Sequence, residues 1–130
     1  MLDQIIQNDP ILKGIILKGC ITMKQLDYLL TQKLNGSDKN LLEKIMKTNN
    51  KTLSKASYII TRKRGKNNLK QAMYTLIISY YLGLVTVDCF AGLEKTAFVL
   101  KEFKDKELRV EQINTVISTL EALIDKLIIV

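Results

Sequence analysis

The sequence predicts a mainly α-helical protein (α+β) that carries one small β-hairpin. Three observations lead to this fold class. Apolar residues recur three and four residues apart over most of the chain, as they do on one face of a helix. Residues that favour helix ends stand at the borders of these segments. After Gly83 the pattern changes to β-branched and aromatic residues, which are typical of strands.

Helix caps predict the N-terminal helices. Asp9 and Pro10 suit the N-cap and the first position of a helix, because proline lacks an N–H that this position does not need. Thr22 and Gln25 have the spacing of a capping box, which predicts a helix to about Leu34. Residues 1–36 are therefore expected to be helical.

Three further helices are expected between Ser37 and Leu82. Ser37 and Thr52 are N-cap candidates for the first two, and the second of these ends at about Arg64. Gly65 is expected to allow a sharp turn before a longer helix from about residue 67. Residues spaced four, three and four apart are predicted to form its inward face: Leu69, Met73, Leu76 and Tyr80.

A hairpin and a long helix complete the predicted fold. The strands span residues 84–90 and 96–100, although residues 92–96 could instead start another helix. The last helix runs from about Leu108 to the end. The apolar residues of this helix follow the pattern of a coiled-coil seam. Either the N-terminal helices or a second copy of the chain must cover them, and we favour a homodimer. The seam residues are Val110, Ile113, Ile117, Leu120, Ile124 and Leu127.

The net charge of +7 is concentrated in one segment. Between Asp38 and Lys70 there are ten basic residues and two acidic ones, whereas the rest of the chain has ten basic and eleven acidic residues. Such a patch attracts polyanions, because each phosphate that it neutralises releases counterions. The sequence therefore predicts a nucleic-acid partner. A solvated surface, an acidic protein or an anionic membrane surface are the alternatives for the same charge.

The order of elements from Leu41 to Leu100 resembles the winged helix-turn-helix fold. The resemblance rests on Leu41–Met46 as the first helix, Thr52–Ala56 at the start of the second, and Tyr80–Val85 where the third passes into the wing. With its long last helix, the chain is similar to small MarR-type or archaeal winged-helix regulators. This resemblance implies a single domain, with N-terminal helices (1–36), a winged-helix core (37–101) and a C-terminal dimerisation helix (105–130). The wing departs from the family in having Glu94 beside its one lysine, Lys95.

In such a fold the third helix would contact the bases of duplex DNA. Amide, hydroxyl and phenol groups on its outward face are suited to base edges. The base-edge candidates are Asn68, Gln71, Tyr74 and Thr75. The clustered cations are suited to phosphates. The phosphate-contact candidates are Lys51, Lys55, Arg62, Lys63, Arg64, Lys66 and Lys70.

The residue content argues against an enzyme. The chain has no histidine, no phosphate-binding glycine loop and no paired carboxylates, so no catalytic residue, metal or cofactor is expected. Cys20 and Cys89 lack the spacing of metal ligands and are expected to be free thiols, although a disulfide is the alternative in a hyperthermophile. No signal peptide or membrane span is recognised, which predicts a cytoplasmic protein without a membrane partner.

Three functions are compatible with this reading. The first is a homodimeric DNA-binding transcriptional regulator. The second is an all-helical basic subunit that lines DNA or RNA in a larger ribonucleoprotein, such as the small subunit of a CRISPR effector. The third is a winged-helix adaptor that binds other proteins. Residues 84–101 distinguish the first two, because a hairpin there favours the regulator and a continuous helix favours the subunit.

Overall fold

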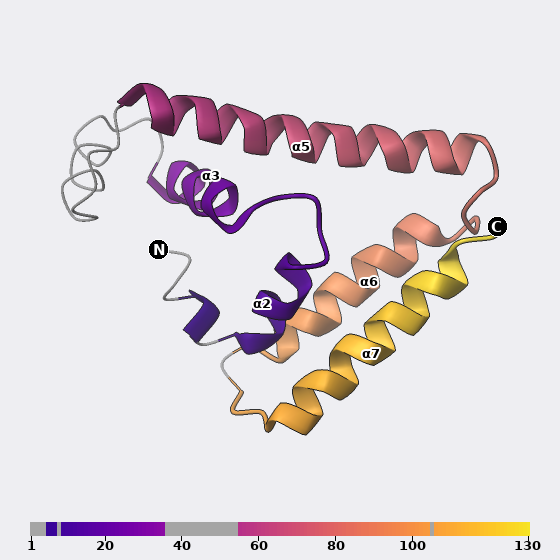
Figure 1. The fold of residues 1–130 in the computed structure, drawn as a ribbon. Coiled ribbons are helices and arrows are strands. Elements are labelled where there is room, and N and C mark those ends of the chain that lie inside the picture. Colours follow the sequence, from indigo (N-terminus) through magenta and orange to yellow (C-terminus); the bar gives the residue numbers. More distant parts are fainter. Residues whose placement is uncertain (1–4, 8, 36–54, 105) are drawn as a thin grey trace.

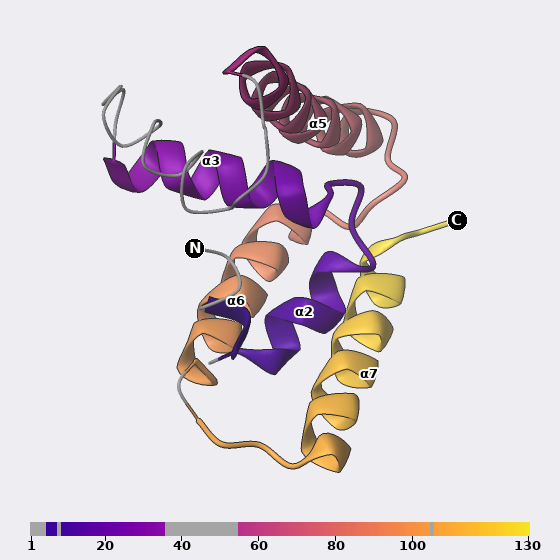
Figure 2. The ribbon, with the colours of Figure 1, turned by 60° about the vertical axis from the view of Figure 1, so that its left-hand side comes forward.

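The computed structural model describes residues 5–7, 9–35, 55–104 and 106–130. Within these ranges, a helical turn at 5–7 is followed by five helices, which lie in two groups (Figure 1). One group pairs α3 with the long α5, and the other contains α2, α6 and α7. Figure 2 shows α5 at the edge of the molecule, with α6 and α7 running away from it. The helices are α2 (Pro10–Ile16), α3 (Met23–Asn35), α5 (Lys55–Tyr81), α6 (Cys89–Glu102) and α7 (Val110–Leu127).

The predicted β-hairpin is wrong, since no strand occurs in the part of the chain that the structure describes. Gly83 has φ 70, a conformation that glycine adopts readily, and it lets the chain turn after α5. The β-branched residues that follow form only one isolated antiparallel bridge, between Val85 and Ile128. Residues 89–102 then form α6, because Cys89, Thr96 and Leu100 recur at helical spacing on its more buried side. The fold is therefore all-helical and lacks the wing of a winged helix.

The predicted turn at Gly65 is also wrong, because α5 is continuous from Lys55 to Tyr81. Gly65 is buried against α3. A Cβ atom at this position would lie 2.9 Å from Cβ of Gln25 and 3.1 Å from Cδ1 of Leu29. Glycine therefore serves here to bring two helices together, and not to break one.

The inward face predicted for this helix is largely wrong. Met73 is 62% exposed, and Leu69 and Tyr80 are also exposed; only Leu76 is half-buried. The face that meets α3 begins instead with Tyr58, whose ring centroid lies 4.7 Å from that of Tyr28. Gly65 and Asn68 extend this contact toward Gln25. Because neither is apolar and large, the spacing of the apolar residues between 69 and 80 does not predict it.

The caps of the N-terminal helices are confirmed. Oδ1 of Asp9 accepts a hydrogen bond from the backbone N–H of Leu12 at 3.1 Å. Thr22 and Gln25 form both bonds of the capping box, each at 3.1 Å. These bonds satisfy N–H groups that the first turn of a helix leaves without partners. The first helix predicted after Ser37 and the cap at Thr52 lie outside the described residues.

The last helix packs within its own chain. Ile117 of the seam lies directly against Gly14 of α2, and Leu127 lies against Gly92 of α6. The helix ends at Leu127 because Ile128 is extended. There the backbone pairs with the loop after α5, through a 2.9 Å bond from Thr86 N to Leu127 O and a 2.8 Å bond from Ile129 N to Leu84 O. No helix in the described ranges is long and apolar enough to cross a bilayer.

Candidate nucleic-acid interface

The cations of the basic segment that the structure describes lie on α5. The sequence has no acidic residue between Glu43 and Asp88, so this helix carries no carboxylate along its length. Six basic residues occupy its first sixteen positions. They are Lys55, Arg62, Lys63, Arg64, Lys66 and Lys70. Lys51, the other predicted phosphate contact, lies outside the described residues.

Three of these lysines share one exposed face. Lys63, Lys66 and Lys70 are three and four residues apart, which aligns them along the helix, and all three are exposed. We call these three residues the cation stripe. Lys55, also exposed, stands about two turns before Lys63 on the same side. The stripe faces away from Gly65, and therefore away from α3.

The two arginines diverge from the stripe. The guanidinium of Arg62 lies 5.7 Å from the ring centroid of Tyr58, which places it on the side nearer α3. Arg64 is exposed but is two residues from Arg62, a spacing that puts side chains on different sides of a helix. The predicted basic turn is thus resolved into a lysine stripe with one arginine on each flank.

No carboxylate in the described ranges forms an ion pair with these six cations. The ion pair found there joins Nζ of Lys18 to Oε2 of Glu121 at 3.4 Å, between α2 and α7. Nearby cations without counterions repel one another, and this repulsion is relieved when an anion binds. The surface is therefore electrostatically complementary to a polyanion.

Two of the four base-edge candidates are engaged inside the protein. Nδ2 of Asn68 donates to Oε1 of Gln25 at 2.9 Å and to the carbonyl of Cys20 at 3.3 Å, so Asn68 joins α5 to α3. The hydroxyl of Thr75 donates to the carbonyl of Gln71 at 2.8 Å. The side chains of Gln71 and Tyr74 are exposed. Asn68, Gln71 and Thr75 are three and four residues apart and so share one side of α5, but the side chain of Asn68 is bonded toward α3.

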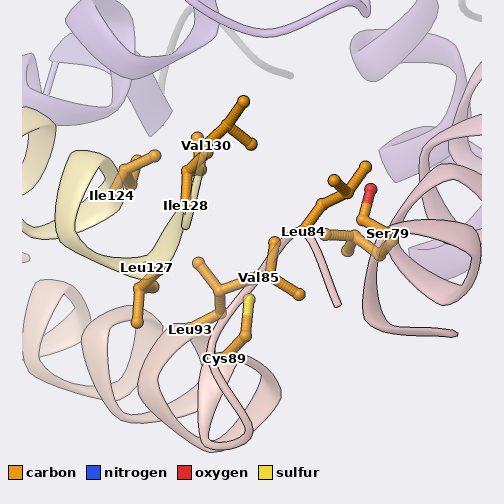
Figure 3. A pocket seen from close by; sticks show the side chains of 10 residues that line it. Ser79, Leu84, Val85, Cys89, Leu93, Ile124, Leu127, Ile128 and Val130 are labelled. Atoms are coloured by element: carbon orange, nitrogen blue, oxygen red, sulfur yellow. The ribbon is translucent and has the colours of Figure 1, made fainter. Parts of the chain in front are cut away.

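Two hollows of the described surface have mainly apolar walls. A pocket of about 330 Å³ lies where α5, α6 and α7 meet (Figure 3). Ser79 is the one polar side chain in its wall, and the sulfur of the buried Cys89 lies among aliphatic groups. A groove of about 450 Å³ between α6 and α7 is lined mainly by apolar residues, with Lys95 at its edge. Within the described ranges, no group of histidine, cysteine and carboxylate side chains could hold a metal ion.

Sequence and structure comparisons link the chain to no characterised family. No family model, curated protein or solved structure matches it. The resemblance to winged-helix regulators also loses its structural basis, since residues 84–101 contain a helix in place of the hairpin. The arrangement of charge on α5 is what remains to indicate a function.

Proposed function

We propose that this protein is a non-catalytic nucleic-acid-binding protein that holds a phosphate backbone on the cation stripe of α5. The observation that carries the proposal is the row of exposed lysines, Lys63, Lys66 and Lys70, on a helix without a single carboxylate. A surface that served solubility alone would not need to exclude acidic residues, because solvated helix faces usually mix both signs.

The geometry suits the backbone of a nucleic acid better than its bases. At 1.5 Å per residue, Lys55 to Lys70 spans about 22 Å along a rigid helix. Lysine ammonium groups on flexible stems bind phosphates as point charges, without reading sequence. Because Asn68 and Thr75 are bonded within the protein, few polar groups beside the stripe are left for base edges. We therefore propose sequence-independent binding.

The all-helical fold supports the second of the three functions considered above. Residues 89–102 form α6 after a short non-helical segment, so most of the region is helical, as a basic subunit of a nucleic-acid complex would require, and none of it is a hairpin. Such a subunit needs a charged surface for the backbone and further surfaces for its neighbours. We propose this role in place of the winged-helix regulator, for DNA or RNA.

Fluorescence anisotropy tests the proposal. Labelled duplex DNA, single-stranded DNA and single-stranded RNA of equal length would be titrated at about 50 and about 200 mM salt. We expect micromolar or tighter binding to at least one probe, little change when its sequence is scrambled, and a marked loss at the higher salt. If none of the probes binds at the lower salt, the proposal is wrong.

A further inference from the structure

The C-terminal half of α5 carries a large exposed apolar patch. Tyr74, Ile77 and Tyr81 are three and four residues apart, and Met73 and Ile78 flank them. Their exposed fractions are 62% for Met73, 66% for Tyr74, 57% for Ile77, 56% for Ile78 and 86% for Tyr81. We call these five residues the apolar patch. In Figures 1 and 2 the other described helices lie to one side of α5.

The area of the patch is close to what one side of a stable interface buries. With about 200 Å² for each large side chain, the exposed fractions amount to roughly 650 Å². A standard interface buries about 800 Å² per partner, and the neighbouring Leu82, itself 61% exposed, adds to the patch. The patch is therefore large enough to form most of one side of a dimer interface.

Charge selects the occupant of the patch. No charged residue occurs between Lys70 and Asp88, so two copies of this surface can meet without burying a charge. A nucleic acid would find no cation there. A membrane-bound amphipathic helix carries its charges opposite its apolar face, whereas α5 separates them end to end. Tyrosine, methionine and isoleucine are suited to the desolvated centre of a protein interface.

We propose that the apolar patch binds the same patch of a second copy of this chain, with the two α5 helices antiparallel. With a two-fold axis near Ile77, the apolar patch of each copy covers that of the other. Lys63 lies 14 residues, or about 21 Å, from this axis along the helix, so the two cation stripes are at opposite ends and more than a Debye length apart. A parallel pair would instead place the stripes side by side.

Analytical ultracentrifugation tests this inference in buffers of low and high salt. We expect the wild-type chain to reach twice the 14.8 kDa of one copy as its concentration rises, at both salt concentrations, because an uncharged interface is not screened. The double substitution Tyr74→Glu and Ile77→Glu should leave a monomer. Phe98→Glu is the matched control, since Phe98 is 67% exposed but lies on α6. This control should remain a dimer.

A second measurement guards against misfolded variants. Circular dichroism should show equal helix content in all three proteins. In a Cys20→Ser background, Ile77→Cys should give a dimer with a short bis-maleimide, whereas Ser118→Cys on the exposed side of α7 should not. A wild-type chain that stays at 14.8 kDa at every concentration would overturn the inference, whether or not it binds uncharged vesicles. So would a glutamate double variant that remains dimeric.

Discussion

Removing the cation stripe should change how nucleic-acid binding depends on salt. The variant replaces Lys63, Lys66 and Lys70 with glutamine, which has nearly the helix propensity of lysine, so α5 is preserved. Each phosphate contact contributes about −0.9 to the slope of log K against log salt on duplex DNA and about −0.7 on single strands. Loss of three contacts should therefore make the slope shallower by about 2.7 or about 2.1.

This difference is large enough to measure by anisotropy. Between about 50 and 200 mM salt, the wild-type protein should lose about 40-fold more affinity for a duplex than the variant, and about 20-fold more for a single strand. The control variant replaces Lys101, Lys104 and Lys106 with glutamine. These lysines are exposed at the far end of α6 from α5 and in the segment that follows it (Figure 1), and the net charge of the control equals that of the variant. Equal slopes in the two variants would refute the reasoning, because the position of the lysines would then not matter.

Three further predictions concern the fold. Gly65→Ala should destabilise the protein by about 1 kcal/mol or more, because overpacking against Gln25 outweighs a helix-propensity gain of about 0.5–1 kcal/mol. Gly92→Ala should be stabilising, because a Cβ there lies 3.5 Å from Cδ2 of Leu127, an ordinary contact. Urea unfolding of both variants checks this, and equal effects would contradict it. Burial raises the pKa of Tyr28 above its ordinary 10.0, and Asp27 and Tyr58 add to the rise. The unfolded chain therefore loses this proton first, so stability should be intact below about pH 10 and fall at higher pH, and a urea-midpoint series on Tyr28→Phe should show a smaller fall. Thr86→Val should stabilise the fold by about 1 kcal/mol, because the buried Oγ1 has no hydrogen-bond partner in the described ranges. Thr96→Val should not stabilise it, because it loses a 2.7 Å hydrogen bond to the carbonyl of Gly92. Calorimetry compares the unfolding temperatures of the two variants.

Local signals in the sequence predicted the N-terminal helices well. The caps at Asp9 and Thr22 depend on side chains that bond to the backbone within three residues, so the sequence alone contains both partners. The long helix at the C-terminus was predicted for the same reason, from its regular apolar spacing. Its partners could be predicted only as alternatives, the N-terminal helices or a second copy, because α2 and α6 reach it through the tertiary fold.

The errors arose where tertiary contacts outweigh local preference. Gly65 looks like a break, but the close approach of α3 requires a residue without a Cβ inside α5. Residues 84–87 have strand propensity, yet they pair with other backbone only in one isolated bridge, between Val85 and Ile128. Asn68 looked free to contact bases because its partners, Gln25 and the carbonyl of Cys20, are more than forty residues away in the sequence.

The candidate site was predicted in part. The run of cations is visible in the sequence, so candidate phosphate contacts can be proposed without the fold. Their division into a stripe of three lysines and two flanking arginines depends on α5 being one continuous helix. The apolar patch was missed, because the spacing of Met73 predicts an inward-facing side chain, whereas Met73 is 62% exposed and lies beyond the part of α5 that meets α3.

Backbone amide chemical shifts, recorded while an oligonucleotide is added to the isotope-labelled protein, test the central claim most directly. Binding at the cation stripe predicts that the largest shifts occur at Lys63, Lys66, Lys70 and their neighbours on α5, and that the segment before α7 is unaffected. Shifts concentrated on α6 or α7, with α5 unchanged, would contradict the assignment of the stripe.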